Sequence, residues 1–469
     1  MRGYAFLLVY LYSLRLIFKS PFNGVLVWYA FSFANFHTLI WNPSLATLPY
    51  AYPIAILTGI SWLFSRAEKK KLPVTPQVIL TILFSLWITI TSYFALAPEE
   101  DVWFKWTFFQ KVLLMCLIGF ALTTTRERVN QLIWVVVLSI GFWGVKGAIS
   151  FPLHGGGEGI HGPDGGITAG NNEFGVALIM ILPLLFYLWH TATDRRIRRG
   201  LMVMGFLITF ATIFTYSRGA LVGVCAMAAV LWLRSPAKMS MGLAILVFGA
   251  AVYALAPQSW FNRMGTIETY QSDSSATGRL DVWRASLRIA ELRPITGGGF
   301  SITHYADITN RMLVGTTIPM LSAGRAAHSI YFDVLSEHGF VGLALFLLIA
   351  VYAWRSCTSL IRNSRDRPDF AWANVLGRMG QALFVGYYIS GAFQSLAYFD
   401  EYWCIVFIFE AARRVVAKEI AAQAGALAVA SSTRLPIPRP AIGAAVRIDE
   451  RSGYASGSRI PDTASHRSL

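Results

Sequence analysis

Apolar stretches of membrane-spanning length recur along the first 412 residues of the chain. A helix needs about 20 apolar residues to cross a hydrocarbon core about 30 Å thick. Hydrophobic residues make up 55% of the 469 residues and charged residues only 14%, which is too apolar for a soluble protein of this length. We therefore predict an all-α, polytopic membrane helix bundle of 12–13 transmembrane helices with one large helical loop on its outer side. The apolar windows lie near residues 4–18, 23–41, 46–64, 76–97, 107–124, 131–150, 173–191, 200–216, 219–233, 240–256, 339–355, 374–398 and 402–412.

The number of crossings depends on residues 4–18. If this window spans the membrane, the N-terminus lies outside and there are 13 helices, whereas an interfacial or re-entrant segment leaves 12. Both alternatives stay open at this point. Because Arg15 lies near the end of the window, Lys19 follows it and no small-residue cleavage site is present, we expect a retained membrane segment and not a cleaved signal peptide.

Short clusters of Lys and Arg separate the windows and set the predicted orientation. Such clusters lie on the cytoplasmic side of membrane proteins. They account for the net charge of +15, so nucleic-acid binding is not expected. The outer side then receives a Gly-rich stretch at 151–172, a turn at Ser217 and Arg218, and the long segment 257–327. The basic clusters lie at residues 65–71, 126–130, 194–199, 234–238 and 355–367.

The composition divides the chain into two parts. Residues 1–413 form the predicted transmembrane domain, and residues 414–469, Ala-rich and then rich in Ser, Arg and Pro, are typical of a disordered cytoplasmic tail. Within the domain, the outer loop 257–327 is the natural place for a site, since long loops in compact proteins are usually functional. Its residues 278–300 have apolar side chains at helical spacing followed by a Gly run, which predicts an amphipathic helix and a turn.

The outer loop 257–327 contains seven Arg and no Lys. The planar guanidinium group matches two phosphate oxygens at once, whereas an ammonium group acts as a point charge. As a set, these arginines favour a phosphate-bearing ligand at the outer face. The alternative is that they contact lipid headgroups or nearby carboxylates. The seven are Arg263, Arg279, Arg284, Arg288, Arg293, Arg311 and Arg325.

Three other charged residues lie at or near membrane depth on the same side. Arg218 follows an apolar run with only a tight turn available, and such a charge normally faces a cavity; the alternative is an Arg that reaches to the interface. Lys146 and Glu173 are similar cases. Glu173, at a predicted helix start, also has a structural use in compensating the helix dipole.

Two glycine runs lie on the outer side. Gly155–Gly157 and Gly297–Gly299 can bring backbone N–H groups up to an anion, but plain turns are the more common use of such runs. Neither run is a phosphate-binding P-loop, because no Gly-Lys-Ser/Thr follows. The four Cys have no spacing typical of a disulfide framework or a zinc site, so no metal is predicted.

His328 and Ser329 open the stretch "HSIYFDVLSEHGFVG", which continues into a membrane helix. The positive end of a helix disfavours the imidazolium form, and a neutral imidazole can accept a proton as a general base must. The alternative is a His that only caps the helix or forms a hydrogen bond at the interface. We expect Ser329 to cap the helix, and His338, ten residues on and on another face, to be structural.

Several of these stretches together resemble a known family. "HSIYFDVLSEHGFVG" looks like the signature of the O-antigen ligase and O-antigen polymerase family, in which it closes the large periplasmic loop. The resemblance runs from the start of the chain to about residue 413, and it is closer still to the O-glycosylation ligase associated with exosortase A systems. The stretches that carry this second resemblance are "AGNNEFGVAL", "YSRGAL", "GRLDVWRAS" and "RPITGGGF".

The resemblance implies a multi-pass protein of the bacterial inner membrane with its active site facing the periplasm. The implied reaction transfers a preassembled glycan from an undecaprenyl diphosphate carrier to an acceptor hydroxyl, without a metal ion or other cofactor. The implied roles are a catalytic base or acceptor-positioning residue for His328, and diphosphate binding for Arg218 and Arg279. Further candidates for the diphosphate or its surroundings are Arg284, Arg288, Lys146, Asn171, Asn172, Glu173 and Gly298.

Two alternatives to the ligase stay open. A polymerase of lipid-linked repeat units would use the same donor site. A flippase or transporter for a lipid-linked glycan suits the helix number, but its polar residues should lie near the middle of the membrane, and here they gather on the outer side. The acceptor, whether protein, lipid or polysaccharide, does not follow from the residues.

Overall fold

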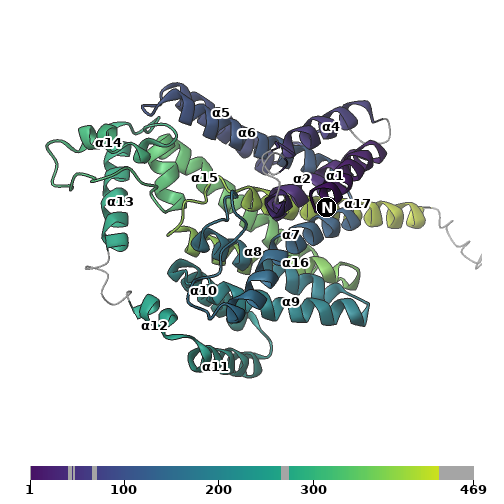
Figure 1. Cartoon of the computed structure of the whole chain (residues 1–469). Coiled ribbons are helices and arrows are strands. Elements are labelled where there is room, and N and C mark those ends of the chain that lie inside the picture. The colour runs from purple at the N-terminus through teal and green to yellow at the C-terminus, as the bar shows by residue number, and fades with distance from the viewer. Residues whose placement is uncertain (1, 41–44, 46–47, 66–70, 266–273, 433–469) are drawn as a thin grey trace, which may run out of the picture. The chain divides into compact units, whose positions relative to one another are not determined.

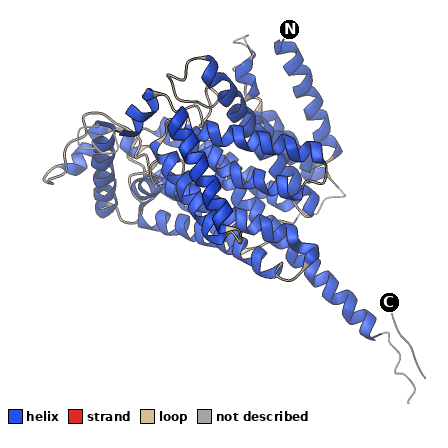
Figure 2. Ribbon diagram, turned by 90° about the horizontal axis from the view of Figure 1, so that it is seen from below, coloured by secondary structure: helices blue, strands red, loops and turns tan. Residues whose placement is uncertain are grey.

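The computed structural model describes residues 2–40, 45, 48–65, 71–265 and 274–432, and the chain divides into two compact units, residues 1–420 and 421–469. The described residues form helices and no strand (Figure 2), and each of the predicted apolar windows overlaps a helix, which confirms the all-α bundle. The α-helices are α1 (Arg2–Lys19), α2 (Pro21–Ala34), α4 (Ala51–Phe64), α5 (Pro76–Tyr93), α6 (Glu99–Leu122), α7 (Arg126–Leu153), α8 (Asn171–Thr191), α9 (Arg195–Ile213), α10 (Arg218–Arg234), α11 (Lys238–Leu255), α12 (Gln258–Gly265), α13 (Ser274–Leu292), α14 (Ala306–Leu313), α15 (Ile330–Asn363), α16 (Ala371–Gly391) and α17 (Asp400–Ser432). Short 3-10 helices are η1 (Phe36–Leu39), η2 (Ile302–His304) and η3 (Pro368–Phe370).

Among the described residues, five helices are long and apolar enough to cross a membrane: α5, α6, α7, α8 and α15. A sixth span results if α11 and α12, bent by 108° at a short break, are one broken span. The protein is therefore a multi-pass membrane protein. The number of 12–13 crossings stays a prediction, because the remaining helices are shorter or less apolar than a standard span requires.

Polar side chains begin several of these helices. The Thr125 hydroxyl accepts a hydrogen bond from the Arg128 backbone N at 3.4 Å, and the Asp194 carboxylate accepts one from the Arg196 backbone N at 2.6 Å. Such caps satisfy backbone N–H groups that the helix itself leaves free. Two of the basic clusters, residues 126–130 and 194–199, thus lie at the starts of α7 and α9.

The core of the first unit lies around α8 and α16, which pack against each other near the centre of Figure 1. Six consecutive residues of α8, Val176–Ile181, are completely buried. A helix that is apolar on all sides is typical of such an interior position. In α17, the residues Tyr402–Phe409 are buried in the same way.

The structure differs from the predicted start of the tail at residue 414, which lies inside α17 because this helix continues to Ser432. Alanine, whose abundance suggested disorder, has the highest helix propensity of any residue type. Here the Ala-rich stretch continues α17. Residues 433–469 of the predicted tail lie outside the described residues.

The outer loop forms a small packed layer of its own. The predicted amphipathic helix is confirmed as α13, and α13 and α14 lie together beside the start of α15 (Figure 1). The Trp283 indole N–H donates to the Ala327 carbonyl at 2.7 Å, and its ring stacks on Phe332 at 5.1 Å. The apolar residues of this layer are Val282, Ala285, Leu313, Leu321 and Ala327.

Candidate functional site

His328 lies directly before α15 with an unusual backbone. Its φ of 48° falls in the left-handed region, which costs a non-glycine residue about 1–2 kcal/mol. Its backbone N–H donates to the Ser395 hydroxyl at 2.9 Å, and that hydroxyl donates to the Asp333 carboxylate at 3.1 Å. The segment after α16 thus holds His328 in a strained conformation, as often occurs at functional sites.

The imidazole ring of His328 is in its neutral form. Its Nδ1 atom is buried and has no hydrogen-bond partner in the described part of the chain. Burial, the guanidinium groups of Arg279 and Arg325, and nearby His304 lower the pKa of His328 from its usual value to about 4. The imidazole is therefore neutral at neutral pH. The sequence pointed to the helix dipole as the cause, whereas in the structure burial and arginine charges are the larger causes.

Ser329 occupies the N-cap position of α15 with an extended backbone, but its side chain makes no capping hydrogen bond. The predicted N-cap position of Ser329 is therefore confirmed, but its side chain does not form the capping hydrogen bond. His338 is completely buried, and its Nδ1 lies 2.7 Å from the Thr91 hydroxyl. Its ring packs edge-on against Phe300 at 4.7 Å, an arrangement that agrees with a structural residue.

Arg325 and His304 belong to the same group of side chains, although the sequence did not single them out as site residues. The Arg325 backbone N–H donates to the Thr303 carbonyl at 3.0 Å, and this bond places Arg325 beside His304. Burial and the ammonium group of Lys105 lower the pKa of His304. The sequence signals for Arg325 were its place in the set of seven outer-loop arginines and its position three residues before His328.

Two arginines of α13 lie away from this group. Arg284 is paired with Asp281 at 3.5 Å and its side chain is 60% exposed. Arg288 is paired with Glu291 at 3.3 Å. Each arginine thus interacts with a carboxylate of its own helix, and diphosphate binding by Arg284 and Arg288 stays a prediction. On α14, Arg311 pairs in the same way with Asp307, and its side chain is 80% exposed.

The other predicted residues surround the start of α8 and α10. The positive charge of Arg279 acts on Glu173, which lies in the first turn of α8. Asn171 donates from Nδ2 to the Thr215 carbonyl at 2.7 Å, a structural role. Arg218 is the first residue of α10, directly after its Ser217 cap. Half-buried Asn172 lies beside Asn171 in the first turn of α8.

Gly298 is used for packing. Its backbone N–H donates to the Ser336 carbonyl at 2.7 Å, and that of Gly299 donates to the Glu337 carbonyl at 2.9 Å. The N–H of Gly297 donates to the Arg293 carbonyl at 2.9 Å. These N–H groups are therefore not available to an anion, so the structure contradicts the anion contact considered for Gly297–Gly299.

Glu337 forms a second polar centre that the sequence analysis missed. One carboxylate oxygen accepts from Lys105 at 2.6 Å and from the Ser301 backbone N–H at 2.8 Å, and the other accepts from the Tyr398 hydroxyl at 2.7 Å. Asp333 lies one helical turn earlier on the same face of α15. Glu337 thus binds Ser301 of the outer loop, whereas Asp333 accepts a hydrogen bond from Ser395, which follows α16.

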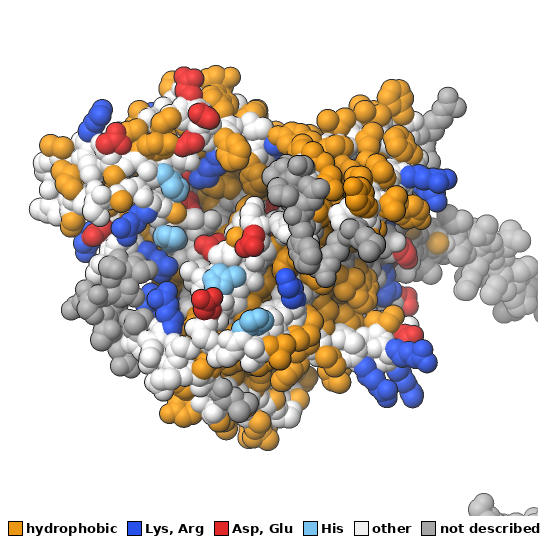
Figure 3. All heavy atoms as spheres, viewed as in Figure 1, with side chains coloured by type: hydrophobic (Ala, Val, Ile, Leu, Met, Phe, Trp, Pro, Cys, Tyr) orange, Lys and Arg blue, Asp and Glu red, His pale blue; other side chains and the backbone are white. Residues whose placement is uncertain are grey.

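A pocket lies between α7 and the Gly-rich loop that follows it. Its volume is about 520 Å³. Lys146 lines it, with its ammonium group 4.5 Å from the centre of the Trp143 ring. His side chains and both signs of charge gather on the face seen in Figure 3, bordered by hydrophobic side chains.

Two family models match separate parts of the chain. Residues 203–347 match the model of the O-antigen ligase family. Residues 1–193 match the model of a family of unknown function, and no curated protein matches the chain. The O-antigen ligase match contains Arg218, Arg279, Arg325 and His328, and it supports a membrane glycan ligase or polymerase.

Within the described residues, no three His, Cys, Asp or Glu side chains are arranged to hold a metal ion. The O-antigen ligase match supports lipid-linked glycans as substrates in a membrane environment. The similarity to the exosortase-associated subgroup stays a prediction.

Proposed function

We propose that this protein is a glycan ligase of the bacterial inner membrane. It transfers a preassembled glycan from an undecaprenyl diphosphate carrier to an acceptor hydroxyl at the periplasmic face. The observation that carries the proposal is His328 itself, which has a strained backbone and a neutral imidazole beside the guanidinium groups of Arg279 and Arg325. A base without charge next to two fixed cations suits a reaction that takes up a proton and releases an anion.

The reaction joins the acceptor oxygen to the anomeric carbon of the glycan. The bond between that carbon and the phosphate oxygen breaks, and its electron pair leaves with undecaprenyl diphosphate. His328 accepts the proton of the acceptor hydroxyl and later releases it to water. Arg279 and Arg325 stabilise the negative charge that develops on the leaving oxygens, since guanidinium groups pair with phosphate through two parallel hydrogen bonds.

Donor binding also makes His328 a better base. In the free protein, burial and then the charges of the two arginines hold the pKa of His328 near 4, which is low for a general base. A bound diphosphate neutralises much of their positive charge, so the pKa of His328 rises towards the working pH. The base therefore becomes effective only when the donor is in place.

The test uses purified protein in nanodiscs with a lipid-linked glycan and the surface molecules of a strain that lacks the gene. We expect His328→Ala to lower kcat at least about a hundredfold with little change in the KM of the donor, as for the loss of a general base. We expect Arg279→Lys and Arg325→Lys to weaken donor binding, because the fork of paired donors is lost. Arg311→Ala, on an exposed local ion pair, is the matched control.

Full glycan transfer by His328→Ala contradicts the role of the base, and normal donor binding by both Lys variants contradicts the diphosphate site. The products also separate the ligase from the alternatives. A single transfer to a non-lipid acceptor supports the ligase, a ladder of lipid-linked products indicates a polymerase, and donor that crosses the membrane without a covalent product indicates a transporter.

A further inference from the structure

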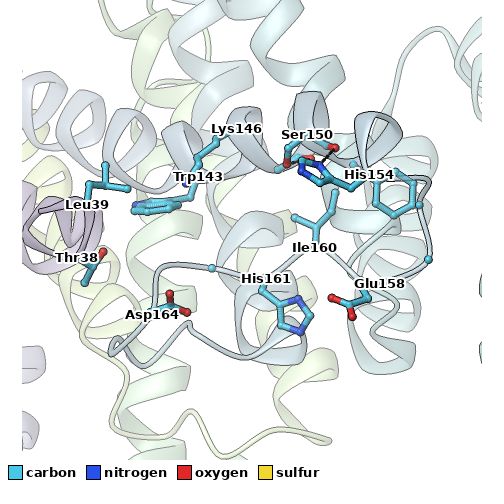
Figure 4. A pocket seen from close by; sticks show the side chains of 16 residues that line it. Thr38, Leu39, Trp143, Lys146, Ser150, His154, Glu158, Ile160, His161 and Asp164 are labelled. Carbon is cyan, nitrogen blue, oxygen red and sulfur yellow. Dashed lines mark hydrogen bonds between the residues drawn. The ribbon is translucent and has the colours of Figure 1, made fainter. Parts of the chain in front are cut away.

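The pocket between α7 and the Gly-rich loop has a built, polar interior (Figure 4). Lys146 and His154 line one side, from the last turns of α7 and the residue after it, and His161 and Asp164 line the other, from the loop. With a volume of about 520 Å³, the pocket has the size of a small-molecule site.

The charges of this pocket differ from those around His328. Glu158, His161 and Asp164 are exposed, and their side chains have no hydrogen bond or ion pair with the rest of the described chain. The carboxylates of Glu158 and Asp164 repel a phosphate group. Hydroxyl groups of a ligand, in contrast, can donate to these carboxylates and accept from Lys146 or His161. The pocket therefore favours a neutral ligand with many hydroxyl groups.

Apolar side chains complete the lining. Trp143, Phe151 and Ile160 all contribute to the wall between the polar groups. A sugar ring has this combination of requirements, because its hydroxyl groups need donors and acceptors while its C–H faces pack on apolar surface.

The loop of the pocket is fastened to the segment that leads to Arg218. The Ile160 backbone N–H donates to the Phe214 carbonyl at 2.8 Å, and the Tyr216 hydroxyl donates to the Gly156 carbonyl at 2.6 Å. Further along the chain, Glu173 interacts with Arg279. The two hydrogen bonds of Ile160 and Tyr216 hold the wall of the pocket against the segment before α10.

We propose that this pocket binds saccharide units of the glycan substrate, separately from the arginine group that binds the diphosphate. The inference rests on the proposed function. All of the lining residues, from Thr38 to Asp164, lie within residues 1–193, the part that matches a family of unknown function. This part of the chain would then provide a sugar-binding site beside the O-antigen ligase match.

The test compares His161→Ala and Asp164→Ala with wild-type protein in nanodiscs. Both side chains are exposed, and the contact from Asn35 Nδ2 to Asp164 uses the Asp164 backbone carbonyl, so both variants should fold. We expect the KM of the lipid-linked glycan to rise about tenfold in each variant, as for the loss of a hydrogen bond. Binding of glycan-free undecaprenyl diphosphate should not change, whereas Arg279→Lys should weaken it. Glu291→Ala, an exposed carboxylate on α13, is the control.

The saccharide can belong to the donor or to a glycosylated acceptor, and the two KM values distinguish these sources. A rise in the donor KM assigns the pocket to the donor, and a rise in the acceptor KM assigns it to the acceptor. Unchanged KM values for both substrates overturn the inference.

A separate measurement keeps the pocket apart from the ligase proposal. The free glycan, released from its carrier by mild acid, is added to wild-type and variant protein, and its binding is followed by saturation-transfer NMR. Binding that is lost in His161→Ala and Asp164→Ala supports the pocket even if no transfer is detected. Equal binding to wild-type and both variants overturns it.

Discussion

His328 combines a left-handed backbone with a buried ring nitrogen that has no partner among the described residues. Each feature lowers the stability of the substrate-free protein, and together they are typical of a site prepared for a ligand. The sequence identified His328 through its position before a membrane helix. It did not reveal Arg325 or His304 beside it, because the bond that places them there joins residues 303 and 325 through the fold of the loop.

The charge state of His328 predicts how transfer depends on pH. Activity requires the neutral imidazole, so the rate falls as the pH drops through the pKa of His328. In the free protein this pKa is about 4, and donor binding raises it by offsetting the charges of Arg279 and Arg325. We therefore expect kcat to fall at a higher pH than kcat/KM for the donor, by about one pH unit or more.

Rate measurements between pH 4 and 8 check this prediction. In Arg325→Gln, one cation that lowers the pKa of His328 is absent, so the acid limb of kcat/KM should move to higher pH. Identical acid limbs for kcat and kcat/KM in the wild-type protein, or an unchanged limb in the variant, would argue against His328 as the base.

The helix α15 is broken at Gly339, where the backbone is not helical, and the glycine turn at residues 297–299 packs against this break. Gly339 has a φ of 68°, and its backbone lies against the carbonyl groups of Pro294 and Ile295. The Phe340 backbone N–H donates to the Pro294 carbonyl at 2.9 Å. The sequence predicted a turn at Gly297–Gly299, but it could not show that this turn docks on the helix of the signature stretch. Contacts between residues about 40 positions apart leave no periodic pattern.

Gly297→Ala should therefore destabilise the protein. The backbone of Gly297 has a φ of 62°. A Cβ atom added there would lie 2.7 Å from the backbone of residues 336–339. We expect a loss of about 3 kcal/mol or more, from the left-handed conformation and the steric overlap together. Thermal unfolding of the purified protein measures this loss.

Gly315→Ala provides the matched control, because Gly315 has a φ of 78° but no atom close to an added side chain. It should cost only the conformational term of about 1–2 kcal/mol. Equal losses in both variants would show that the close packing on α15 contributes nothing.

Glu337 joins α15 to Ser301 of the outer loop, to Lys105 of α6 and to Tyr398, which lies between α16 and α17. Glu337→Ala leaves these donors without their acceptor, and we expect a loss of about 2 kcal/mol in the free energy of unfolding. Because Lys105 is partly exposed, water offsets part of the larger cost typical of a buried ion pair. Glu291→Ala, which removes an exposed ion pair, should change stability by less than about 0.5 kcal/mol in the same unfolding assay. A similar loss in both variants would contradict the structural importance of Glu337.

Across the whole molecule, apolar length was sufficient to predict the long apolar helices, but not the short helices α12 and α14. Every apolar window overlaps a helix, since burial in lipid or in protein requires the same continuous apolar stretch. The pocket was not predicted, because it joins Thr38, Lys146 and Asp164 from three separate segments. The tail boundary differed because α17 extends beyond the last apolar window, through residues whose helix propensity does not depend on burial.

The predicted orientation of the bundle can be tested on either side of α15. Val314, 68% exposed, precedes this helix in the outer loop, and Arg365, with a side chain 82% exposed, follows it in a basic cluster. If α15 crosses the membrane once and the basic cluster is cytoplasmic, the two positions lie on opposite sides. In a Cys225→Ser background, which removes the exposed thiol of the described chain, a membrane-impermeant maleimide should label Val314→Cys in cells with a permeabilised outer membrane. It should label Arg365→Cys only after the inner membrane is opened. Labelling of both cysteines before that step would contradict the single crossing, and labelling of Arg365→Cys alone would place the His328 site in the cytoplasm.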